Sequence, residues 1–165
     1  MTNLLEFADE EEALQPSASL AYNQSLVYVS VNYRRGVLGF LSLDSLSERS
    51  KTKSSGNYGL GDIISALKWI KNNIQHFGGL PSQVTLMGRG SGATLATALT
   101  ASPMARGLFK QVWVTNGAGV YENTSLATAY SQNKVAKNHY ILTMFDSGEI
   151  IVKARFAGPN NNLFE

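Results

Sequence analysis

The feature that most constrains the fold is an apolar stripe with helical spacing between residues 60 and 77. Gly78, Gly79 and Pro81 follow directly and predict the end of this helix, with glycine supplying a left-handed cap. A helix with one apolar side has to bury that side against another layer of structure. The stripe is formed by Leu60, Ile63, Ile64, Leu67, Ile70, Ile74 and Phe77.

Strands are predicted on both sides of this helix. Residues 26–32 are rich in β-branched and aromatic side chains and predict a strand that is buried on both faces. Shorter apolar runs at 84–87 and 112–115 predict two more strands, with a second helix from Ala93 to about Ala101 between them. The alternation of strand and helix predicts an α/β fold with a parallel sheet and flanking helices.

The remaining segments give weaker predictions. Residues 37–43 are apolar and predict a short strand or a packed loop, whereas the polar residues 44–57 predict a surface loop. Near the end of the chain, residues 139–156 could hold two strands around a turn at 146–148. Residues 159–165 predict a frayed end.

Composition limits the classes of function. A chain of 165 residues has room for about one domain, and a net charge of +2 does not indicate a nucleic-acid partner. With no cysteine, the sequence excludes disulfides and thiolate metal sites within these residues. It contains no apolar run long enough to span a membrane, and its start has no pattern of a signal peptide. No cofactor is expected.

The predicted turn between the strand at 84–87 and the second helix fits two kinds of chemistry. One is the nucleophile elbow, Gly-x-Ser-x-Gly, which presents a serine on a sharp turn above a sheet. Gly88 and Gly92 match its outer glycines, so residue 90 stands at the tip, and residue 90 is glycine. Ser91 comes one position late, and Arg89 and Ala93 stand where its own flanking glycines would be.

The other is the dinucleotide fingerprint, Gly-x-Gly-x-x-Gly/Ala, which Gly88, Gly90 and Ala93 satisfy. That motif expects an acidic residue about 20 positions later to bind the ribose hydroxyls. No Asp or Glu occurs between Asp62 and Glu122. The glycines also have a simple structural explanation, because they permit a tight turn under either interpretation.

Several blocks of sequence, in order, resemble the carboxylesterase/cholinesterase (type B) family over residues 20–120. The blocks are VSVNYRRGVLGFLS at 29–42, GNYGLGD at 56–62, ALKWIKNNIQHFGG at 66–79, VTLMG at 84–88 and GLF at 107–109. The resemblance implies a partial α/β-hydrolase fold that is incomplete in this chain, a fragment. Residues 1–138 would be the N-terminal part of that domain, and residues 139–165 a poorly matched tail.

The elbow of that family normally reads Gly-Glu-Ser-Ala-Gly, whereas here Arg89, Gly90 and Ser91 replace its three central residues. This departure resembles the non-catalytic, neurotactin-like branch of cell-adhesion proteins. The resemblance implies no catalytic residue, and an extracellular or cell-surface protein as partner. It also implies a parent protein in the plasma membrane with this domain outside the cell. Neither nucleic-acid binding nor membrane contact is expected of this segment. The alternatives are a fragment of an active carboxylesterase and a dinucleotide-binding domain.

Other candidate residues have ordinary explanations. Asn23 and Asn123 begin N-glycosylation sequons, although composition alone predicts about two such matches. His76 is expected at the helix end, where a cation suits the helix dipole. His139 falls in the poorly matched tail. The pair Arg34 and Arg35 is expected to make structural hydrogen bonds. The tryptophans Trp69 and Trp113 are expected to pack within the fold.

Overall fold

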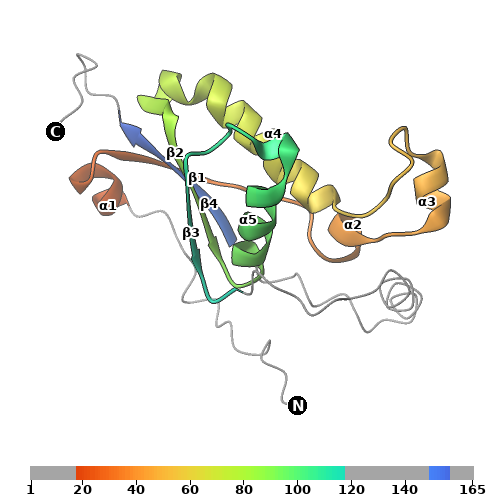
Figure 1. Ribbon diagram of the computed structural model, residues 1–165. Coiled ribbons are helices and arrows are strands. Elements are labelled where there is room, and N and C mark those ends of the chain that lie inside the picture. Colours follow the sequence, from red (N-terminus) through yellow and green to blue (C-terminus); the bar gives the residue numbers. More distant parts are fainter. Residues whose placement is uncertain (1–17, 118–148, 157–165) are drawn as a thin grey trace.

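The computed structural model describes residues 18–117 and 149–156 (Figure 1). These residues form a four-stranded sheet with helices, and two of the helices cover one of its faces. The elements in chain order are α1 (Ala18–Asn23), β1 (Leu26–Ser30), α2 (Gly36–Phe40), α3 (Asp44–Arg49), α4 (Tyr58–Asn73), η2 (Ile74–Phe77), β2 (Gly79–Arg89), α5 (Ser91–Ala101), η3 (Pro103–Ala105), β3 (Gln111–Thr115) and β4 (Glu149–Phe156).

The predicted long helix is confirmed as α4, which continues into the 3-10 turn η2. Ile63, Leu67 and Ile70 are buried along one side of α4, as the spacing predicts. Gly78 ends the helix at a φ of 80°, and its N–H donates to the carbonyl of Gln75 at 3.0 Å. This left-handed conformation favours glycine, so the predicted cap is also confirmed.

The sheet is mixed, with the strand order β1-β4-β2-β3. β2 and β3 are parallel, as predicted for two strands joined by a helix. β4 is antiparallel to both β1 and β2 and lies between them, so the prediction of a wholly parallel sheet is wrong. The prediction concerned strands joined by the helices at 60–77 and 93–101, and β4 was not one of them.

The buried core lies on the face of the sheet that α4 and α5 cover (Figure 1). Leu86 of β2 is opposite Val152 of β4, and both side chains have no exposed surface. The next pair on this face, Val84 and Ala154, is also buried. Burial of one such side chain contributes about 1.5–3 kcal/mol, so this row joins β4 firmly to the helices.

Other local predictions are wrong. Residues 26–32 do contain a strand, but β1 lies at the sheet edge and its side chains are only half-buried or exposed. Residues 36–40 form the short helix α2, where a strand or loop was predicted, and the predicted loop at 44–57 begins with helix α3. Their helical segments are one to two turns long, too short to show a clear period in the sequence.

The two tryptophans are more exposed than predicted. Trp69 on α4 is 50% exposed and lies 6.0 Å from Phe77 between ring centroids. Trp113 on β3 is 56% exposed. It lies opposite Met87, on the face that carries no part of the buried α4–α5 cluster, because side chains alternate along a strand.

The predicted tail strands have a mixed outcome. β4 confirms a strand after residue 148, whereas residues 139–148 and 159–165 lie outside the described residues. In the part of the chain that the structure describes, no helix combines the length and the apolar character needed to cross a membrane.

Candidate functional site

The candidate site is the turn between β2 and α5, where Gly90 has φ 58° and ψ −125°. Hydrogen bonds hold this residue from both sides. Its N–H donates to the carbonyl of Thr115 at the end of β3, at 3.0 Å. Its carbonyl accepts from the N–H groups of Ala93 and Thr94 in the first turn of α5, at 3.1 and 3.3 Å. The chain therefore reverses sharply at a tip fixed by β3 and α5.

The glycines around the tip have different reasons to be glycine. A Cβ on Gly88 would lie 2.5 Å from the carbonyl oxygen of Gly92 and 2.8 Å from the backbone nitrogen of Ala93. A Cβ on Gly117 would overlap the side chain of Ala93 and lie 2.7 Å from the carbonyl oxygen of Gly90. Strand, helix and following loop thus approach so closely that no side chain fits at these two positions.

Gly90 itself stands in open space, because a Cβ there would meet no atom of the described residues within 4 Å. Its positive φ is a conformation that only glycine adopts without strain. A side chain at residue 90 would therefore project freely from the tip, at a cost in backbone energy. This geometry agrees with the elbow predicted from Gly88 and Gly92.

The hydroxyl of Ser91 is the one nearest the tip along the chain. Its Oγ is buried and has no hydrogen-bond partner among the described residues. Arg89 is half-buried at the end of β2. Neither side chain replaces a hydroxyl that projects from residue 90.

His76 is remote from this turn. It lies exposed in the last turn of η2, as predicted. His76 therefore precedes the first residue of β2, whereas Gly90 directly follows the last residue of that strand. With 11 residues in β2 and about 3.3 Å per residue, His76 and Gly90 are on the order of 30 Å apart. His139 is outside the described residues. Within residues 18–117 and 149–156, no group of three or more histidine, aspartate or glutamate side chains could hold a metal ion.

The predicted structural role of Arg34 is confirmed. Its Nε and Nη2 donate to Oδ2 and Oδ1 of Asp62 at 2.8 and 2.7 Å, and its backbone N–H donates to Oδ2 at 3.0 Å. The guanidinium carbon also lies 5.4 Å from the ring centroid of Tyr58. These contacts fasten the segment after β1 to the first turns of α4, so this arginine is not an open anion site.

These hydrogen bonds hold the pKa of Asp62 below its ordinary value, although burial opposes the shift. A carboxylate whose pKa is lowered by folding stabilises the folded state at pH values above its pKa in the unfolded chain, which is near 3.9. This stabilisation is lost as the pH falls through the lower pKa of the folded state. We expect urea midpoints of the wild type, measured from pH 5 to pH 2, to fall more steeply than those of Asp62→Asn. Parallel curves for the two proteins would contradict this expectation. Both side chains are partly exposed, so the effect is expected to be modest.

Comparison with known proteins identifies the family. The family model described as "Carboxylesterase family" matches residues 6–147. The chain belongs to the carboxylesterase family. Its curated relatives include neurotactin of Drosophila melanogaster, 43% identical over 121 residues, which are 73% of this chain and 14% of that protein. They also include fumonisin B1 esterase of Sphingopyxis macrogoltabida, 46% identical over 88 residues, which are 53% of this chain and 16% of that protein.

Solved structures agree with this assignment. A carboxylesterase of Geobacillus stearothermophilus superposes with a TM-score of 0.58 and 34% identity, covering 65% of this chain and 22% of that one. The predicted partial α/β-hydrolase fold is therefore confirmed, with a mixed sheet. This carboxylesterase-family chain spans about one ninth to one quarter of the length of the relatives that it matches.

The predicted glycosylation residues remain predictions. Asn23 is exposed at the last position of α1, where a glycan could be attached without disturbing the core. Asn123 lies outside the described residues.

Proposed function

We propose that this chain is part of a catalytically inactive carboxylesterase-like domain that acts in protein recognition at the cell surface. The observation that carries the proposal is glycine at residue 90, at the tip of a turn with elbow geometry. Glycine has no side-chain oxygen to attack an ester carbonyl. Loss of the nucleophile of a serine triad lowers turnover on the order of 10⁶-fold.

The relatives of this chain support both adhesion and esterase functions. Neurotactin and neuroligin-2 belong to the adhesion branch, and neuroligin-2 of Mus musculus is 41% identical over 101 residues, 61% of this chain and 11% of that protein. Several other relatives carry esterase names, so active ester hydrolysis is the second candidate. The sequence at the tip favours the adhesion branch, because an active enzyme needs a nucleophile there.

Dinucleotide binding has less support. We interpret Gly88, Gly90 and Ala93 as parts of an elbow instead, because the chain belongs to the carboxylesterase family and Gly90 lies in a sharp turn between a strand and a helix. The residue at the end of β3, where the ribose-binding acid is expected, is Asn116.

The remaining parts of the proposal follow from the adhesion relatives. The partner would be an extracellular or cell-surface protein, and the parent protein would lie in the plasma membrane with this domain outside the cell. Neither nucleic acid nor a lipid surface would be a partner of this segment. We place the family-like part at residues 1–138 and the tail at 139–165.

A fluorophosphonate probe tests the absence of a nucleophile, with an active esterase of the family as positive control. We expect no covalent label on the purified chain, because residue 90 lacks a hydroxyl and the Ser91 hydroxyl is buried. A label mapped to Ser91 by peptide mass spectrometry would overturn the proposal.

The variant Gly90→Ser tests whether the missing hydroxyl is the only defect. We expect hydrolysis of p-nitrophenyl acetate to stay at the background rate, because no described histidine lies near the tip. The strained backbone should also lower the free energy of unfolding by about 1–3 kcal/mol. Turnover well above that of the wild type would show that the rest of an esterase site is intact.

A further inference from the structure

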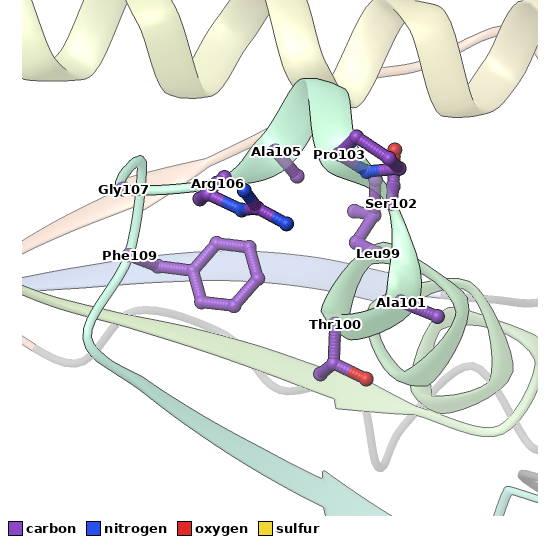
Figure 2. A pocket seen from close by; sticks show the side chains of 9 residues that line it. All are labelled: Leu99, Thr100, Ala101, Ser102, Pro103, Ala105, Arg106, Gly107 and Phe109. Atoms are coloured by element: carbon purple, nitrogen blue, oxygen red, sulfur yellow. The ribbon is translucent and has the colours of Figure 1, made fainter.

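A cavity of about 210 Å³ lies between the C-terminal end of α5, the turn η3 and the loop that leads to β3 (Figure 2). The tip at Gly90 is at the other end of α5, and a helix of 11 residues is about 16 Å long. The cavity is therefore separate from the elbow.

Among the described residues that line this cavity, Arg106 is the only charged one. Its side chain is exposed, and no hydrogen bond or ion pair joins its guanidinium to another described residue. In Figure 2 the guanidinium reaches over the ring of Phe109 toward Leu99. Leu99 is 1% exposed and Phe109 is half-buried, so the walls beside the cation are apolar. Ser102 adds a hydroxyl at the rim.

The loop that carries Arg106 is fixed by backbone hydrogen bonds. The N–H of Ala105 donates to the carbonyl of Ser102 at 3.1 Å, and that of Lys110 donates to the carbonyl of Val84 at 2.8 Å. The ammonium of Lys71 on α4 donates to the carbonyl of Gly107 at 3.1 Å. The site is therefore formed before a ligand arrives, which lowers the entropy cost of binding.

The stretch of sequence that contains the cavity residues carries charge of one sign. Residues 63–121 contain no Asp or Glu, but they contain Lys68, Lys71 and Lys110 in addition to Arg106. The acidic residues with described side chains, Asp44, Glu48 and Asp62, belong to α3 and to the first half of α4. No acidic neighbour in sequence competes for the guanidinium, so the cavity favours an anion.

We propose that this cavity binds the carboxylate side chain of an acidic segment in a partner protein, a specific form of the protein recognition proposed above and dependent on it. The planar fork of Arg106 matches a carboxylate with two parallel hydrogen bonds. Leu99 and Phe109 would contact the methylene groups of the acidic side chain that carries this carboxylate. Inorganic phosphate can also pair with the arginine fork, but it has no methylene groups to lie against Leu99 and Phe109, so it should bind more weakly.

The test is a titration of the full 165-residue chain, followed by backbone amide NMR. The probe is the peptide acetyl-Leu-Glu-Glu-Leu-amide, and the matched control replaces both glutamates with glutamine. We expect the glutamate peptide to shift amide signals between residues 99 and 109, and the glutamine peptide to shift them little. Inorganic phosphate, added separately, should bind more weakly than the peptide.

Three variants then assign the binding to the arginine fork. Arg106→Ala should weaken binding of the glutamate peptide about fivefold or more, and Arg106→Lys should recover only part of it. Lys51→Ala removes the same charge from the exposed turn after α3 and should leave affinity within about twofold. The variants should keep the wild-type amide spectrum outside the cavity, which separates lost binding from lost folding.

Equal binding of the two peptides, unchanged affinity in Arg106→Ala, or tighter binding of phosphate would each overturn the inference. The fluorophosphonate result distinguishes this failure from failure of the proposed function. An unlabelled chain that ignores the glutamate peptide would reject the cavity alone. A chain labelled at Ser91 would reject the recognition function, on which the role of the cavity depends.

Discussion

Replacing Val152 by aspartate should abolish cooperative folding of the chain. Val152 is fully buried in the middle of β4, opposite Leu86 on one side and Val29 on the other. A carboxylate in that place would lose its hydration, because Val152 has no exposed surface. Its burial costs several kcal/mol even if it takes up a proton. That cost is comparable with the whole stability of a small domain, about 5–15 kcal/mol.

The position of β4 explains why the effect should be global. Among the described strands, β1 is joined to the rest of the sheet only through β4, since the strand order is β1-β4-β2-β3. Loss of β4 would detach β1 and leave one edge of β2 unpaired. The family match ends at residue 147, so this central strand comes from sequence beyond it. We therefore expect residues 149–156 to be as necessary for folding as the family-like part.

Lys153→Asp is the matched control, because it introduces the same residue one position later. Lys153 is half-buried and points to the opposite face of the sheet, between Tyr28 and Thr85 in register. We expect its free energy of unfolding, measured by urea titration with far-UV circular dichroism, to stay within about 1 kcal/mol of the wild type. Equal losses in both variants would show that β4 tolerates aspartate on neither face. Cooperative folding of Val152→Asp would show that burial at the centre of β4 is not required.

Local patterns in the sequence were enough to predict α4, the β2–α5 turn and β3. A helix of 16 residues repeats its apolar spacing several times, and glycines mark both its end and the turn. The place of β4 could not be predicted in this way. Alternation of Ile150, Val152 and Ala154 indicates a strand, but which strands it joins depends on contacts far along the chain.

The same limit applies to the candidate site. Gly88 and Gly92 were predicted from the spacing of the elbow, whereas Gly117 was missed. It lies 27 positions after Gly90, and only the pairing of β3 with β2 brings its backbone against Ala93. Arg106 and Phe109 likewise give no signal of a binding site in the sequence, because their cavity is formed by the packing of η3 against the end of α5.

Gly88→Ala should lower the free energy of unfolding by about 3 kcal/mol or more, although it adds a single methyl group. The new Cβ would lie 2.5–2.8 Å from backbone atoms of Gly92 and Ala93, which cannot rotate away as the end of a side chain could. Relief requires α5 to move away from β2, and α5 contributes the buried side chains of Leu95 and Leu99 to the core. Overpacking against mobile side chains costs about 1–3 kcal/mol, and contact with rigid backbone should exceed it.

Two other glycines separate the clash from the loss of glycine itself. Gly90→Ala adds the same methyl group at the tip, where it meets no atom, and should cost only the backbone strain of about 1–3 kcal/mol. Gly61→Ala adds it in the exposed part of α4, again with no atom within 4 Å, and should stabilise the chain by about 0.5–1 kcal/mol. Urea midpoints should therefore rank Gly61→Ala above the wild type, then Gly90→Ala, then Gly88→Ala. If Gly90→Ala is the least stable, strain at the tip rather than close packing of β2 against α5 is what requires glycine in this turn.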